Sequence, residues 1–136
     1  MRFEASVVVR AAHEKVYSAY TDFGAAPKWS SQAKAAVVSA DGNLVRLETE
    51  GNGRKVIREM RLFPPERVES EWETRFTRAS SVVKFEDLQE GTRVTATLDI
   101  RFKGHWGWIL RTRGKADAES SAAQELNSFA RYVEAL

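Results

Sequence analysis

Apolar and polar residues alternate over most of the chain, which is the pattern of strands with one buried face. The clearest alternation runs through residues 66–77. There the side chains predicted to face one way are Val68, Ser70, Trp72, Thr74 and Phe76, with charged residues between them. Glycine-rich and asparagine-rich turns separate such segments. The pattern predicts strands over residues 3–10, 33–40, 44–50, 54–63, 66–77, 80–88 and 92–103.

Helical spacing replaces this alternation in two places. Residues 13–23 put apolar side chains on one stripe, and the Gly and Pro residues at 24–29 predict a second short helix or a turn. Residues 115–136 contain neither Gly nor Pro, and their apolar positions Leu126, Phe129, Ala130 and Val133 have helical spacing. We therefore expect a long helix at the C-terminal end.

The order of these elements indicates how they pack. A sheet of six to seven strands with one apolar face needs a cover, and only the last helix is long enough to provide it. The sequence predicts an α+β fold, with a curved antiparallel sheet wrapped around a long C-terminal α-helix and two short helices after the first strand. Residues 1–136 are expected to form a single domain.

Composition narrows the function classes. The net charge is +2 over 136 residues, which gives no reason to expect nucleic-acid binding. Cysteine is absent, which excludes thiolate catalysis and thiolate metal sites, and the only histidines, His13 and His105, lack metal-ligand spacing. No signal peptide or apolar run of membrane-spanning length is present. We expect a cytoplasmic protein that needs no cofactor and no metal.

The segment VYSAYTDFGAAPKW, residues 16–29, resembles the signature of the START/Bet v 1-like (SRPBCC) superfamily. The matching positions are Val16, Tyr17, Thr21, Asp22, Phe23, Pro27 and Trp29. The chain looks most similar to the polyketide cyclase/dehydrase and lipid transport branch, although Ala11 and Ala12 stand where the family often has proline. The resemblance implies a helix-grip fold with a hydrophobic cavity between the sheet and the long helix. Family members carry lipids, hormones or polyketides in that cavity, and a minority perform chemistry there.

The predicted inward faces supply candidate ligand-binding residues. They are Arg58, Met60, Ser70, Trp72, Thr74, Phe76, Phe85, Leu98 and Ile100. Arg58 is the most informative of them, because a buried guanidinium could orient a carboxylate, phosphate or enolate oxygen of a ligand. The alternatives are that the apolar residues simply fill a core, and that Arg58 occupies a solvated rim position.

A basic aromatic segment, residues 101–115, follows the last strand and contains five cations and no acid. His105, Trp106 and Trp108 are candidates for a gate at the cavity entrance. Cations beside tryptophans are typical of a transient contact with a membrane surface. The alternative is that the rings pack under the sheet while the arginines stay solvated.

Three hypotheses follow for function. The first is the binding or transport of a small hydrophobic ligand, such as a lipid, an isoprenoid quinone or a polyketide-like molecule. The second is a cyclase, aromatase or dehydratase in which Arg58 polarises a carbonyl and Trp72 shapes the pocket. The third is a protein-interaction domain, which needs an exposed apolar patch that the sequence does not identify. We favour binding and predict no catalytic residue, because the inward faces offer only Arg58 and hydroxyl groups, and His13 is expected to be exposed.

Overall fold

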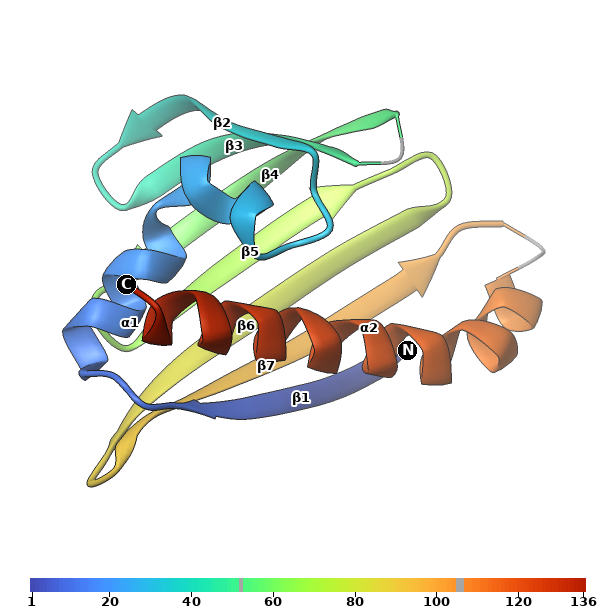
Figure 1. Cartoon of the computed structure of the whole chain (residues 1–136). Helices are drawn as coiled ribbons and strands as arrows, with labels where there is room; N and C mark the ends of the chain where they lie inside the picture. Colours follow the sequence, from blue (N-terminus) through green and yellow to red (C-terminus); the bar gives the residue numbers. More distant parts are fainter. Residues whose placement is uncertain (52, 105–106) are drawn as a thin grey trace.

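The computed structural model describes the backbone of residues 1–51, 53–104 and 107–136, and the side chains of these ranges outside residues 107–116. Seven strands form one antiparallel sheet in the order β1-β7-β6-β5-β4-β3-β2 (Figure 1). The strands are β1 (Arg2–Val9), β2 (Lys34–Asp41), β3 (Leu44–Gly51), β4 (Arg54–Phe63), β5 (Arg67–Glu73), β6 (Thr77–Leu88) and β7 (Gly91–Phe102). The helices are α1 (His13–Thr21), the 3-10 helix η1 (Phe23–Lys28) and α2 (Gly107–Glu134).

β1 and β2 lie at opposite edges of the sheet, and the strands from β2 to β7 follow one another in sequence order back to β1. β1 pairs with β7 at one edge, and α1 and η1 carry the chain to the opposite edge, where β2 begins. From β2 to β7 each strand pairs antiparallel with the next. The sheet curves around α2, which lies across its concave face (Figure 1). The predicted α+β fold and its two short helices after the first strand are confirmed.

The core lies between the concave face and α2. Leu126, Phe129, Ala130 and Val133, the stripe that predicted the helix, are all buried in it. Phe129 is fully buried and meets the rings of Tyr20 and Trp29 edge to face at 5.6 and 4.8 Å between centroids. These aromatic contacts join α2 to the segment that carries the family signature.

Two predicted boundaries are wrong. β5 ends at Glu73 and β6 begins at Thr77, so the strand predicted over residues 66–77 is too long and the next one too short. A tight turn lies between them, in which the Thr74 amide donates to the Thr77 carbonyl at 2.8 Å and the two hydroxyls lie 2.6 Å apart. Alternation of residue types continues through this turn, so the periodicity could not locate it. Phe76 therefore lies outside β5 and is 52% exposed.

The long helix begins earlier than the sequence predicts. α2 starts at Gly107, and its backbone continues through Gly114, which was expected to precede the helix. One glycine within a helix costs only about 1 kcal/mol relative to alanine, too little to end a helix supported by tertiary packing.

His13 also differs from expectation. It is half-buried, and its Nε2 atom is buried without a hydrogen-bond partner among the described residues. His13 is the first residue of α1, so the packing of that helix turn brings part of the ring inside.

Candidate ligand pocket

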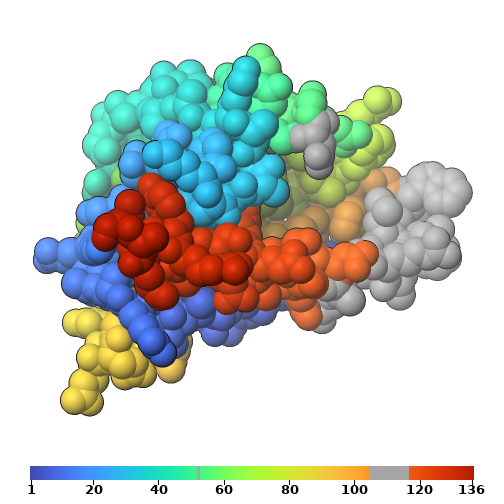
Figure 2. Space-filling model, in the orientation of Figure 1, coloured from blue at the N-terminus to red at the C-terminus, as the bar shows by residue number. Residues whose placement is uncertain are grey.

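A pocket of about 380 Å³ lies between the concave face of the sheet and α2. The segment that follows η1 borders it on one side, through Ser30, Ser31 and Gln32. In the space-filling view the surface is hollowed beside this segment, directly above the orange part of α2 (Figure 2). The pocket is therefore reached from outside between the segment after η1 and α2.

Most of the wall is apolar and comes from elements far apart in the sequence. The apolar lining residues include Phe3, Phe23, Trp29, Leu47, Val56, Met60, Trp72, Val83, Leu98 and Leu126. Ala122 faces the pocket from α2, and its small side chain leaves space that a larger residue would fill. The result is a concave apolar site of the kind that encloses small organic molecules.

Arg58 is the half-buried cation of this pocket. It lies on β4 directly opposite Trp72 of β5, and its guanidinium sits over the Trp72 ring at 4.4 Å from the centroid. Its Nε donates to the hydroxyl of Thr49 at 3.2 Å, and Thr49 is itself buried. Burial lowers the pKa of Arg58, while the charges of Tyr20 and Glu125 raise it. The ring and the hydroxyl thus fix the guanidinium with most of its N–H donors still available.

Glu125 and Tyr20 add two oxygen-bearing groups to the same pocket. Burial raises the pKa of Tyr20 to about 12; the negative charge of Glu125 acts in the same direction and Arg58 opposes it. The Glu125 carboxylate accepts a hydrogen bond from the backbone amide of Ser31 at 3.3 Å, which links α2 to the segment after η1. A cation, a carboxylate and a neutral phenol therefore border one apolar space.

Sequence reasoning missed Glu125 as a site residue. Its signal was present, since Ala122, Leu126 and Phe129 form an apolar helical stripe and Glu125 lies at the border of that stripe. Only the position of α2 over the sheet shows that this border faces the pocket.

The predicted ligand-binding residues fall into three groups. Arg58, Met60, Trp72 and Leu98 line the pocket. Ser70 and Phe85 lie in the packed core, where Ser70 is 2.6 Å from the Ser81 hydroxyl and Phe85 contacts the Tyr17 and Tyr20 rings. Thr74, Phe76 and Ile100 do not line the pocket, because the first two belong to the β5–β6 turn and Ile100 is half-buried farther along β7. The candidate gate lies outside the described residues: His105 and Trp106 entirely, and the side chain of Trp108.

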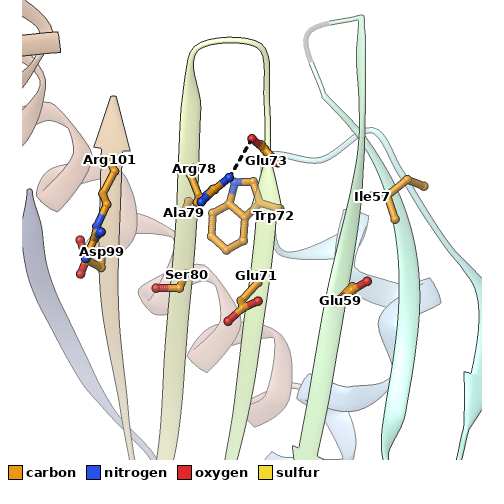
Figure 3. A pocket seen from close by; sticks show the side chains of 10 residues that line it. All are labelled: Ile57, Glu59, Glu71, Trp72, Glu73, Arg78, Ala79, Ser80, Asp99 and Arg101. Carbon is orange, nitrogen blue, oxygen red and sulfur yellow. Dashed lines mark ion pairs between the residues drawn. The ribbon is translucent and has the colours of Figure 1, made fainter. Parts of the chain in front are cut away.

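A second hollow, of about 560 Å³, lies on the outer face of the sheet (Figure 3). Charged residues of β4 to β7 dominate its lining, among them Glu59, Glu71, Asp99 and Arg101. These side chains are largely solvated, and Arg78 pairs with Glu73 at 3.5 Å. It is larger than the inner pocket but offers no enclosed apolar wall, so the inner pocket is the candidate site.

Neither a metal centre nor a membrane-spanning helix is found in the described part of the chain. No group of three or more His, Cys, Asp or Glu residues there could hold a metal ion. No described helix is long and apolar enough to cross a membrane.

The fold and the pocket together define a helix-grip protein of the ligand-binding SRPBCC class. Residues 1–134 match the family model described as polyketide cyclase / dehydrase and lipid transport, and the chain belongs to this family. The resemblance in residues 16–29 is thereby confirmed. A comparison with curated proteins gives no match.

Solved structures share the fold over almost the whole chain. TTHA0849 from Thermus thermophilus is 24% identical, with a TM-score of 0.85 over 99% of this chain and 98% of that one. The Zhui aromatase/cyclase from Streptomyces sp. R1128 is 17% identical, with a TM-score of 0.78 over 98% and 93%. A START superfamily protein from Mycobacterium smegmatis is 18% identical, with a TM-score of 0.65 over 91% and 94%. At these identities the likeness concerns the fold alone.

Proposed function

We propose that the protein binds a small, largely apolar ligand in the inner pocket and that Arg58 holds a polar oxygen of that ligand. The observation that carries this proposal is a half-buried guanidinium in the pocket wall with unused donors. Arg58 takes part in no salt bridge between described residues, and Thr49 is its one hydrogen-bond partner among them. Because burying an unpaired cation is costly, a ligand oxygen at this position would compensate for its lost hydration.

The pocket size favours a compact ligand. Its 380 Å³ lies near the lower end of the range of about 300–1,000 Å³ typical of small-molecule sites. A fused-ring polyketide-like molecule or the head of an isoprenoid quinone suits this volume better than a lipid with two acyl chains. Among the ligand classes associated with the family, the pocket volume and Arg58 therefore favour compact molecules that carry a polar oxygen.

Native mass spectrometry of the protein purified from its own source tests this proposal, because a bound molecule would appear as an added mass. We expect Arg58→Ala to weaken binding of the identified molecule about tenfold to hundredfold, since a hydrogen bond to a charged group contributes about 1.5–3 kcal/mol. Arg61→Ala is the matched control, because Arg61 lies on the same strand and is exposed. Equal affinity in the wild type and Arg58→Ala would contradict the role of Arg58.

A second candidate function is a cyclase, aromatase or dehydratase, and Glu125 is the observation that favours it. A carboxylate in an apolar pocket can remove a proton from a carbon beside a ketone, while Arg58 stabilises the resulting enolate oxygen. Attack of the enolate carbon on a second carbonyl of the same molecule closes a ring, and loss of one water makes it unsaturated. The family description and the aromatase/cyclase activity named for the Zhui structure are consistent with this chemistry.

Glu125→Gln separates the two functions. The amide keeps the shape of the side chain and can still accept the hydrogen bond from Ser31, but it cannot act as a base. An enzyme is expected to co-purify with its dehydrated product in the wild type and with a molecule heavier by one water in the variant. A carrier is expected to hold the same molecule in both proteins.

A further inference from the structure

The exposed edge of the sheet at β2 has an unusual composition. β2 is the last strand of the sheet, and its main neighbours are β3 and η1. No further strand of the sheet pairs with its other edge (Figure 1). Val37 and Val38 are 51% and 56% exposed, and between the end residues Lys34 and Asp41 the strand has no charge and no proline. Natural edge strands usually carry charged residues or proline, which prevent pairing with another chain.

The sequence of β2, KAAVVSAD, reads nearly the same from both ends. Its centre lies between Val37 and Val38, and Ala35 and Ala40 are equally distant from that centre. Lys34 and Asp41 are the outermost pair and have opposite charges. Two copies aligned antiparallel about this centre would place each Lys34 opposite an Asp41, with apolar residues between the two ion pairs.

A β-bulge makes the faces of this alignment agree. In a regular strand, residues separated by an odd number of positions face opposite sides. In β2 the register with β3 shifts between Val37 and Ser39, so Ala35 and Ala40 share one face, opposite Thr49 and Val45. Lys34 and Asp41 share the other face, opposite Glu50 and Leu44. Because the bulge lies at the centre of β2, the order of inward-facing and outward-facing residues is the same when the strand is followed from either end.

From this symmetry we infer that β2 pairs with β2 of a second copy of the chain, antiparallel and about a two-fold axis between Val37 and Val38. The two sheets then continue into one another, Lys34 of each copy pairs with Asp41 of the other, and the exposed valines meet at the centre. This contact is isologous, so it closes at two copies. It is independent of the inner pocket and of the ligand proposed for it.

The strength of the contact follows from its size. β2 has eight residues, so the pairing buries less surface than the 1,200–2,000 Å² or so typical of stable interfaces. We expect a reversible dimer with a dissociation constant on the order of micromolar. Sedimentation of the wild type over a concentration series should show the dimer forming, and a monomer at every concentration up to about 1 mM overturns the inference.

Disulfide trapping tests the register directly, because the chain has no cysteine of its own. Ala35 and Ala40 lie roughly 16 Å apart along one strand, too far for a disulfide. Directly opposite residues of paired strands have Cα atoms about 4.5–5.5 Å apart, within disulfide reach. We expect a mixture of Ala35→Cys and Ala40→Cys proteins to give a cross-linked dimer under mild oxidation, whereas each variant alone gives none. No cross-link in the mixture, or equal cross-linking in each variant alone, overturns the proposed register.

A charge exchange provides a second test. Lys34→Asp or Asp41→Lys alone places like charges opposite one another at both ends, and each should raise the dissociation constant at least about tenfold. The double variant Lys34→Asp/Asp41→Lys restores opposite charges and should return the constant to near the wild-type value. A double variant as weak as the single ones contradicts pairing of these two residues.

Discussion

Burial shifts the pKa values of two titratable groups of the pocket, Arg58 and Tyr20, in opposite directions. It disfavours the charged form of each, so it lowers the pKa of Arg58 and raises the pKa of Tyr20. At neutral pH Arg58 remains a cation and Tyr20 remains a neutral phenol. The pocket therefore presents hydrogen-bond donors toward an apolar space, which is the arrangement that a ligand oxygen needs.

Tyr20 gives the protein a pH dependence at alkaline values. The unfolded chain loses the Tyr20 proton near pH 10.0 and the folded protein near pH 12. In this interval the folded state binds more protons, so stability falls as pH rises, by at most about 1.4 kcal/mol per pH unit. We expect Tyr20→Phe to reduce this loss, as measured by urea unfolding at a series of pH values between 10 and 12. An equal loss of stability with pH in the wild type and in Tyr20→Phe would contradict this role of Tyr20.

Strands and helices were predictable as elements, whereas their ends were decided by contacts. Period-two alternation was clear in strands such as β5 and β7, because one face of each packs toward the core, whereas β1 was predicted from its valine run and β2 is exposed at almost every position. Alternation could not separate β5 from β6, since the hydrogen bonds between Thr74 and Thr77 define that turn without interrupting the alternation. The start of α2 was missed because glycine signals a break in local sequence but does not enforce one.

The β6–β7 hairpin contains a glycine that its neighbours leave no room to replace. Gly91 has a φ of +153°, and a Cβ added there would overlap the backbone carbonyl of Val9, where β1 ends beside β7. Gly42, in the β2–β3 turn, also has a positive φ of +59° but open space around it.

Gly91→Ala should therefore destabilise the protein more than Gly42→Ala does. Gly42→Ala is expected to lower the free energy of unfolding by about 1 kcal/mol, from backbone strain alone. Gly91→Ala adds an overlap with the neighbouring strand, which costs a further 1–3 kcal/mol or so. Urea denaturation of both variants measures the difference, and equal losses would show that β1 can shift without cost.

On the scale of the whole molecule, the pocket depends on elements that are far apart in sequence. Tyr20 comes from α1, Arg58 from β4 and Glu125 from α2, and the curvature of the sheet brings them to one space.

The basic aromatic segment, residues 101–115, supports a further prediction for the whole molecule. We propose from its sequence that it contacts anionic membranes, with tryptophan rings at the headgroup level and cations near the lipid charges. Co-sedimentation with vesicles containing phosphatidylserine should show binding at low salt that weakens as salt is added. Trp106→Ala/Trp108→Ala should abolish it, and vesicles of neutral lipid are the control. Wild-type protein that ignores anionic vesicles at low salt would contradict this proposal.

The sequence by itself determined the class of fold, the order of the main elements and the family, and it made Arg58 a candidate without deciding between an inward and a rim position. It could do so because burial of one face imposes a period on each element, and because the signature in residues 16–29 is local. Only the tertiary structure decided that Glu125 shares the pocket with Arg58, that Phe76 lies outside it, and that the bulge aligns the two halves of β2. Those facts depend on how elements distant in the chain lie against each other, and no period within a single element records that.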